Sequence, residues 1–305
     1  MEYLIETRNL TKQYGKSIVV NDVSIHVPKG KIYALLGRNG AGKTTLMKMI
    51  LKLIRATSGE IYLFGAMCGK INRNIYRQIG SIIETPGFYE NLTAFENLSL
   101  LMRLRGHEKK EDLIRALEMV GLHNEHKKPF SDYSLGMKQR LGIAAALMHE
   151  PKLLVLDEPI NGLDPIGITE IRTLLTSLCR DKGTTILISS HVLSEIEQIA
   201  DIIGVMHEGY LIEEIKMEEL RKCRRKYIEF EVSDTTKALE ILWESYGIKD
   251  CQVRSSTLKV FDTTYSCGVI NKVLVENGLM VTSLNENKEN LEEYFAELIG
   301  GGGVA

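Results

Sequence analysis

The chain has 305 residues, of which 44% are hydrophobic, and this is enough for two domains with cores of ordinary size. A formal net charge of −2 gives no overall field that would attract nucleic acid, so we expect no nucleic-acid partner and only local anion sites. The sequence has no secretory signal and no apolar run of about 18 residues, which predicts a protein that does not cross a membrane. Five dispersed cysteines without a C-x-x-C pair are typical of a reducing cytosol and argue against zinc or disulfides.

The N-terminal part alternates apolar and polar positions and predicts a small antiparallel sheet. We expect strands over Leu4–Tyr14 and Ser17–Val27, followed by an apolar strand over residues 32–36. Tyr14 lies in the turn between the first two strands. Its ring is either a half-buried turn aromatic or a surface that stacks on the face of an adenine.

A glycine-rich turn follows the apolar strand and has the spacing of a phosphate-binding loop. It matches the pattern G-x-x-x-x-G-K-[ST], and a helix with apolar positions at residues 46–54 comes next. The glycines turn backbone N–H groups toward a polyphosphate, and the start of the helix adds positive charge. We expect Lys43 to neutralise the β- and γ-phosphates of ATP and Thr44 to ligate Mg²⁺. The loop consists of Gly37, Arg38, Asn39, Gly40, Ala41, Gly42, Lys43, Thr44 and Thr45.

The next segments change from strand to helix. Ser58–Gly65 has the pattern of a hairpin, and Ile79–Glu84 that of a buried strand that ends in a carboxylate. Residues 86–151 are helical in character, with apolar positions at a 3.6-residue period over Glu96–Leu104 and Glu111–Val120. We therefore predict a helical insertion between two β-rich segments.

The insertion ends in a helix that runs from Tyr133 to about His149. Ser134 has the position of an N-cap, and Gly136 leaves the backbone open to approach. Taken alone, this is the pattern of an ordinary capped helix. Its meaning depends on the segments that follow.

Two acidic residues end the next apolar strand. Leu153–Leu156 is followed by Asp157 and Glu158, and the carboxyl end of such a buried parallel strand is where nucleotide sites of open α/β sheets lie. Asp157 is expected to hold Mg²⁺ through water, and Glu158 to orient or deprotonate the attacking water.

A turn over Asn161–Pro165 and a helix over Ile166–Cys179 lead to a further buried strand over Thr184–Ser190. His191 ends that strand at the same edge as Glu84 and Asp157, so we expect it to face the γ-phosphate rather than to be an ordinary polar residue.

The order of these motifs over residues 3–215 resembles that of the ATP-binding subunits of ABC transporters. The resemblance implies that Tyr14 stacks on the adenine, that residues 37–45 are the Walker A loop, and that Asp157 and Glu158 are the Walker B pair. It further implies the following roles: Asp164 is the D-loop acid, His191 is the switch histidine, and Ser134 and Gly136 match the signature that contacts the γ-phosphate on the opposite subunit.

Two departures from the family pattern stand out. Leu135 replaces a signature glycine and Tyr133 the leading leucine, but Ser134 and Gly136 are kept, so we expect the site to be active but slower than usual. Glu84 stands where the family usually has a glutamine that joins the magnesium site to the membrane partner. The run over residues 83–89 is similar to the bacitracin-resistance and lantibiotic-immunity branch, which favours antimicrobial peptides as substrates.

These features predict an ATPase that works as a dimer. One chain offers the loop and the acids but no arginine finger, so the remaining donors to the phosphates, Ser134 and the amides near Gly136, are expected from a second copy. The predicted partners are thus a second ATP-binding subunit, in a homodimer, and integral membrane transporter subunits. The predicted location is the cytoplasm, peripheral on the inner face of the cell membrane.

The remainder of the chain carries no motif for chemistry. Glu213–Lys226 is charged and predicts a solvated linker helix, with contact to anionic lipid or a partner as the alternative. Beyond it we predict an α+β domain of split-βαβ type. Its elements are strand 226–232, helix 235–246, strands 250–254 and 257–262, helix 266–277, strand 279–284 and helix 288–299.

The predicted fold class is therefore α/β, an ABC-type P-loop ATPase with an antiparallel β subdomain and a helical subdomain. The expected domains are an ATP-binding domain over residues 1–215 with its helical subdomain at about 86–150, a linker over 216–225, and an accessory domain over 226–305. Two other functions stay open at this point. One is a soluble ABC-type ATPase that acts on ribosomes or DNA, and the other a non-catalytic nucleotide-dependent regulator.

Overall fold

The computed structural model describes residues 2–68, 73–84, 87–106, 109–125, 127–223, 225–262, 264–288 and Phe295. The chain divides into two compact units, Met1–Glu218 and Glu219–Ala305, and each unit has a hydrophobic core of its own. None of the described helices is both long enough and apolar enough to span a membrane.

The first unit is built on a six-stranded sheet in the order β11-β10-β4-β9-β8-β7. All neighbours pair in parallel except β10 and β11. Every residue of β4, β8 and β9 is buried, which explains why β4 and β8 appear as continuous apolar runs in the sequence and why β9 has an apolar centre. The strands are β4 (Ile32–Leu36), β7 (Ile79–Ile82), β8 (Leu153–Leu156), β9 (Thr185–Ser190), β10 (Ile202–His207) and β11 (Tyr210–Lys216).

A second, antiparallel sheet has the order β2-β1-β5-β6, with β3 paired to β1 as well. The single strand predicted over residues 17–27 is wrong, because this segment forms two strands, β2 and β3. β2 pairs with the second half of β1, and β3 pairs with its first residues. Thr7 fills the break: its hydroxyl donates to the Val23 carbonyl (3.0 Å) and accepts from the Ile25 amide (2.9 Å). The strands are β1 (Tyr3–Tyr14), β2 (Ser17–Val23), β3 (His26–Pro28), β5 (Ser58–Leu63) and β6 (Ala66–Met67).

Helix α1 (Lys43–Ile50) joins the two sheets into one core. Its buried side chains Leu46, Met47 and Met49 belong to the same apolar cluster as Leu10 of β1 and residues of β8. Burial of such side chains contributes about 1.5–3 kcal/mol each, so the start of α1 is held firmly under the phosphate-loop sequence. Helices α5 (Pro165–Lys182) and α6 (Leu193–Ile196) complete the sheet region.

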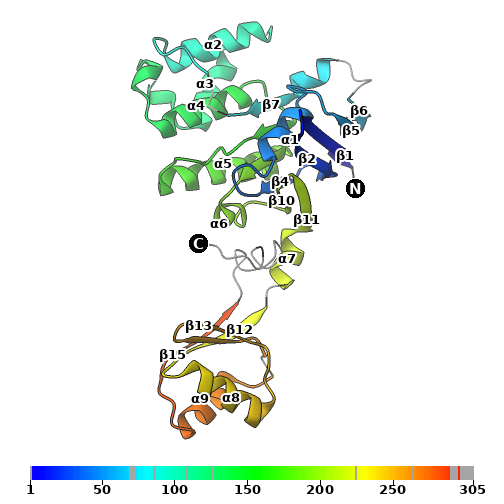
Figure 1. Ribbon diagram of the computed structural model, residues 1–305. Helices are drawn as coiled ribbons and strands as arrows, with labels where there is room; N and C mark the ends of the chain where they lie inside the picture. The colour runs from blue at the N-terminus through cyan, green and yellow to red at the C-terminus, as the bar shows by residue number, and fades with distance from the viewer. Residues whose placement is uncertain are drawn as a thin grey trace. The chain divides into compact units, whose positions relative to one another are not determined.

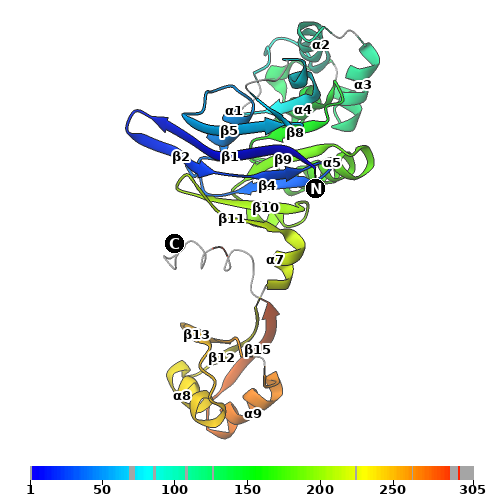
Figure 2. The ribbon, with the colours of Figure 1, turned by 90° about the vertical axis from the view of Figure 1, so that its right-hand side faces the viewer.

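The predicted helical insertion gathers at one end of the first unit (Figure 1, Figure 2). Thr93 and Glu96 form a capping box at the start of α2, which satisfies two backbone N–H groups. The helices are α2 (Ala94–Leu104), α3 (Lys110–Met119) and α4 (Leu135–Leu147), with 3₁₀ turns over Arg73–Gln78, His123–Glu125 and Phe130–Asp132.

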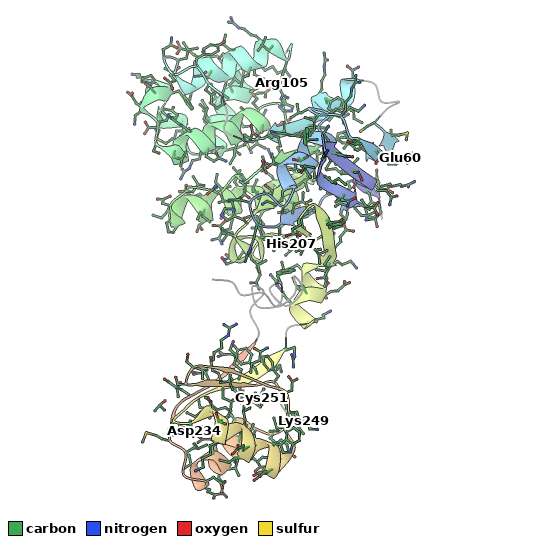
Figure 3. The ribbon with its side chains drawn as sticks, viewed as in Figure 1. Glu60, Arg105, His207, Asp234, Lys249 and Cys251 are labelled. Carbon is green, nitrogen blue, oxygen red and sulfur yellow. The ribbon has the colours of Figure 1, made fainter. Side chains whose placement is uncertain are left out.

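The second unit is a four-stranded antiparallel sheet in the order β13-β14-β12-β15, with α8 and α9 on one face (Figure 1, Figure 2). This order interleaves two β-α-β units, which is the predicted split-βαβ arrangement. Asp234 begins α8 by accepting from the Lys237 amide (3.0 Å), and Lys249 lies 4.4 Å above the Trp243 ring (Figure 3). The elements are β12 (Lys226–Val232), α8 (Thr235–Tyr246), β13 (Cys251–Arg254), β14 (Thr257–Val260), α9 (Cys267–Glu276) and β15 (Val281–Lys288).

The predicted linker helix over Glu213–Lys226 is too long. Residues up to Lys216 belong to β11, and only α7 (Met217–Cys223) is helical. Glu214 explains the error, because this charged residue accepts a hydrogen bond from the buried Tyr33 hydroxyl (2.7 Å) instead of facing solvent. The helix predicted over residues 288–299 overlaps β15 at Lys288, and its other residues lie outside the described ones apart from Phe295.

Candidate functional site

The phosphate-loop sequence follows β4 at the carboxyl edge of the parallel sheet. Lys43 is only 5% exposed, and its Nζ donates to the carbonyl oxygens of Gly37 (2.5 Å) and Arg38 (3.2 Å). The same Nζ lies 3.2 Å from Glu158 Oε1. A buried ammonium group is thus held inside the curl of the loop, where a phosphate oxygen is able to replace these weak acceptors.

Two glycines allow the loop to take this shape. Gly42 has a φ of 101° at the position before α1, a conformation that L side chains rarely adopt. A Cβ at Gly37 would lie 2.4 Å from the Met206 carbonyl oxygen, so only glycine fits against β10 there. The loop also bonds to the turn between β10 and β11, since the Gly209 amide donates to the Ala41 carbonyl (3.2 Å).

Asp157 follows β8 and is fixed by two hydroxyl groups. Thr44 Oγ1 donates to its Oδ2 (2.7 Å), and Ser189 Oγ donates to its Oδ1 (2.6 Å). Ser189 also accepts from the Glu158 amide (2.9 Å), so this serine of β9 positions both acidic residues. Asp157 is 7% exposed, which places its carboxylate directly beside the Thr44 hydroxyl in a mostly dry environment.

Each oxygen of the Glu158 carboxylate has a neighbour in the site. His191 Nδ1 lies 2.9 Å from Oε2, and the buried Oε1 lies 3.2 Å from Lys43 Nζ, an ion pair without hydrogen-bond geometry. Its backbone φ is 47°, a conformation that costs a non-glycine residue about 1–2 kcal/mol. The surrounding structure therefore holds a buried carboxylate oxygen in the site, and this oxygen becomes able to accept a hydrogen bond from water when Lys43 turns to a phosphate.

Glu84 follows the last residue of β7 by two positions, and β7 is the strand that pairs with β8. The Asp157 amide donates to the Ile82 carbonyl (2.9 Å), which aligns the ends of the two strands. Glu84 Oε1 lies 2.5 Å from Lys48 Nζ of α1, and its side chain is 64% exposed. Thr85 and Pro86 of the run over residues 83–89 lie outside the described residues.

Tyr14 lies at the end of β1, where the chain turns toward β2. Its side chain is 49% exposed, and Lys12 Nζ lies 4.6 Å from the centre of the ring. Tyr14 is therefore half-buried, as one alternative predicts, and its exposed half leaves room for stacking on an adenine, as the other requires.

The signature-like residues lie at helix starts on the surface. Ser134 is exposed and caps α4 by accepting from the Met137 amide (3.3 Å), and Asp164 caps α5 by accepting from the Gly167 amide (2.9 Å). Leu135 is 55% exposed and packs against Gly162. No hydrogen bond or ion pair links Ser134 or Asp164 to the phosphate loop of the same chain in the described ranges.

The donor set at the sheet edge fits a magnesium nucleotide. Asp157 and Thr44 supply a carboxylate and a hydroxyl, the hard oxygen ligands that Mg²⁺ takes together with phosphate oxygens and water. Among the described residues, no group of three His, Cys, Asp or Glu side chains has the arrangement of a metal site.

Burial raises the pKa of the Glu195 carboxyl. The charges of Arg172 and His191 oppose that rise, and the charge of Glu158 adds to it.

Two residues of this site were not predicted from the sequence. Ser189 joins Asp157 to Glu158, and Lys48 pairs with Glu84. The two serines between the apolar run Ile186–Ile188 and His191 were the available signal for Ser189. Lys48 follows Thr44 by one helical turn, which was the available signal that it faces the same strand ends.

Comparison with known proteins agrees with this geometry. The sequence model of the family described as "ABC transporter" matches residues 20–161. The chain is 61% identical to the "Bacitracin transport ATP-binding protein BcrA" of Enterococcus faecalis over 100% of this chain and 99% of that protein. It is 48% identical to the "Lantibiotic transport ATP-binding protein SrtF" of Streptococcus pyogenes, over 68% of this chain and 89% of that protein.

A solved structure shares the fold of the first unit. It is a dimeric ATP-binding cassette in a post-hydrolysis state with ADP and phosphate bound, and it matches with a TM-score of 0.64 and 25% identity over 70% of this chain and 98% of that one. The α/β cassette fold is therefore confirmed, as is the predicted resemblance to the bacitracin and lantibiotic branch. This chain belongs to the ATP-binding subunits of ABC transporters.

Proposed function

We propose that this chain hydrolyses ATP and that the hydrolysis powers export of an antimicrobial peptide of the bacitracin or lantibiotic kind. The observation that carries the proposal is the meeting of Lys43, Asp157 and Glu158 at one sheet edge, where Glu158 Oε1 is buried with Lys43 Nζ, 3.2 Å away, as its ion-pair partner. The substrate class is supported by 61% identity to a bacitracin transport protein over the whole chain, including the second unit. Transport names among the relatives disfavour a soluble ATPase acting on ribosomes or DNA.

In the proposed complex, ATP lies along the phosphate loop with its adenine on Tyr14. The loop amides and Lys43 neutralise the phosphates. The cradle consists of Gly37, Arg38, Asn39, Gly40, Ala41, Gly42, Lys43, Thr44 and Thr45.

Thr44 and Asp157 would hold Mg²⁺, with Glu84 at the border of the same site. The ion supplies positive charge that stabilises the phosphate oxygens during transfer. Ser189 keeps the Asp157 carboxylate turned toward Thr44, because its hydroxyl occupies the other carboxylate oxygen.

Glu158 is the proposed general base. Its Oε1 accepts a proton from the attacking water once Lys43 has moved to the phosphates, while Oε2 is held by His191. Lys43 is close enough to stabilise the carboxylate before ATP arrives, and it turns to the γ-phosphate when the loop is filled. His191 then has two roles, orienting Glu158 and sensing the phosphate.

The site is completed by a second copy of the chain. Ser134 and Asp164 are exposed, Gly136 is partly exposed, and neither Ser134 nor Asp164 bonds to the loop of its own chain within the described residues, which supports a homodimer in which these groups meet the nucleotide of the partner. The dimeric ATP-binding cassette among the solved relatives supports the same arrangement.

The proposed partners outside the homodimer are integral membrane transporter subunits, which place the chain on the cytoplasmic face of the membrane. The domain limits that follow are an ATP-binding domain over residues 1–215 with a helical subdomain at about 86–150, a linker over 216–225, and an accessory domain over 226–305. Two separate cores support this division.

Tyr14→Ala is expected to weaken ATP binding about tenfold, since loss of an aromatic stack on a base costs roughly 1–3 kcal/mol. Titration with a fluorescent ATP analogue measures the effect. Tyr14→Trp keeps an aromatic face and is expected to bind within about twofold of the wild type. Equal affinities of all three proteins would remove Tyr14 from the adenine site.

The transport role is tested in a bacitracin-sensitive bacterium. Expression of the chain with the membrane proteins encoded beside its gene is expected to raise the inhibitory concentration of bacitracin or a lantibiotic, and Glu158→Gln to abolish that gain. Resistance that survives in the Glu158→Gln strain would contradict a role for ATP hydrolysis in export.

A further inference from the structure

Glu84 brings a third carboxylate to the sheet edge, and the structure supplies a cation for it. The parallel pairing of β7 with β8 sets Ile82 opposite Leu156, so Glu84 and the Asp157–Glu158 pair follow neighbouring strand ends. Glu84 has a φ of 62°, which turns the chain sharply after the strand. A negatively charged side chain is thus introduced beside two others that already crowd this edge.

The cation is Lys48, and it comes from the same helix face as the metal-site hydroxyl. Thr44 and Lys48 are one helical turn apart on α1 and therefore lie on one face. Thr44 Oγ1 donates to Asp157 Oδ2 at 2.7 Å, and Lys48 Nζ lies 2.5 Å from Glu84 Oε1. Helix α1 hence makes one link to the end of β8 and a second link to the segment after β7.

The charges at the edge divide into pairs. Lys43 lies beside Glu158 (3.2 Å) and Lys48 beside Glu84, while Asp157 is bonded to neutral hydroxyls. With a glutamine at position 84, Lys48 would have no anion to pair with there. The effect of Lys48 on the affinity for a bound cation therefore depends on whether position 84 carries a charged residue.

We propose that Lys48 is a positioning residue that competes with the divalent metal for Glu84. In the free chain it holds the Glu84 carboxylate at the margin of the site. When metal and nucleotide bind, the carboxylate leaves Lys48 and accepts a hydrogen bond from a metal-bound water. This inference rests on the proposed function, since it needs a metal nucleotide at Asp157 and Thr44.

The test measures metal affinity and not turnover. Mn²⁺ replaces Mg²⁺ as a paramagnetic probe, and its binding to the full-length chain saturated with a non-hydrolysable ATP analogue is followed by electron paramagnetic resonance. Lys48→Gln is expected to tighten Mn²⁺ binding about threefold, since loss of an exposed ion pair frees the carboxylate. Lys48→Arg keeps the charge and is expected to match the wild type.

A double-mutant cycle separates competition for Glu84 from a general charge effect. In a Glu84→Gln background, Lys48→Gln is expected to change Mn²⁺ affinity by less than about twofold. Lys52→Gln is the matched control, because this lysine lies just after the end of α1 and donates to the Cys68 carbonyl instead of a carboxylate.

Two results would overturn the inference alone. The first is an increase in Mn²⁺ affinity by Lys48→Gln that is equal in the wild-type and Glu84→Gln backgrounds. The second is no increase in Mn²⁺ affinity in the wild-type background. Both results count only if the metal-free protein still binds a fluorescent nucleotide in EDTA. A chain that binds no nucleotide in either condition would overturn the proposed function together with this inference.

Discussion

Glu158→Gln is expected to lower steady-state ATP hydrolysis about 10²- to 10³-fold, since a positioned general base contributes 10²–10⁴-fold. Glutamine has nearly the same shape, and its amide oxygen accepts a hydrogen bond from water but does not take up a proton at neutral pH. Nucleotide binding is expected to persist or to tighten slightly, because Lys43 loses the carboxylate at 3.2 Å and is left free for the phosphates. The variant should therefore accumulate as a nucleotide-filled dimer.

Phosphate release measures the first effect, and size-exclusion chromatography with ATP measures the second. Glu195→Gln is the matched control, because it neutralises a neighbouring carboxylate that is close to His191 and Glu158 but makes no ion pair with Lys43 among the described residues. It is expected to hydrolyse ATP within about threefold of the wild type. Near-normal turnover by Glu158→Gln would assign the base to another residue.

The residues that could be predicted from the sequence are those whose spacing is local. The phosphate loop needs its glycines and Lys43 within one turn between a strand and a helix, and the chain shows both neighbours. The acids and His191 end apolar strands, so their meeting at one edge follows from the rule that parallel strands share their carboxyl edge. None of this required knowledge of a tertiary contact.

The parts that could not be predicted depend on pairings between distant segments. Glu214 is a charged residue in a charged stretch, and only the pairing of β11 with β10 brings it to the Tyr33 hydroxyl and within 2.8 Å of His26 Nδ1. Burial and this carboxylate raise the pKa of Tyr33 well above its usual value, so the tyrosine stays a donor. A helical linker was therefore predicted where a strand carries a buried polar contact.

The signature surface gives the second large prediction. Lys43→Ala removes the loop lysine, and Ser134→Asp places a negative charge opposite the γ-phosphate of the partner while keeping a side chain that caps α4 well. Each variant alone is expected to lose nearly all hydrolysis. A mixture of equal amounts is expected to recover about a quarter of the wild-type rate, because half of the dimers are mixed and each has one intact site.

The recovery follows from which chain supplies each half of the site. In a mixed dimer the Ser134→Asp chain contributes an intact loop and the Lys43→Ala chain an intact signature, so one composite site is normal and the other carries both changes. If loop and signature of one chain formed the site, no dimer would contain an intact one, and the mixture would be as inert as its parents. Because turnover of a single site also depends on coupling between the two sites, trapped nucleotide is measured as well. In a Glu158→Gln background each mixed dimer is expected to retain about one ATP and the parents none. Ser134→Asn, which caps the helix without a charge, should retain more hydrolysis than Ser134→Asp if repulsion at the partner's phosphate is the cause.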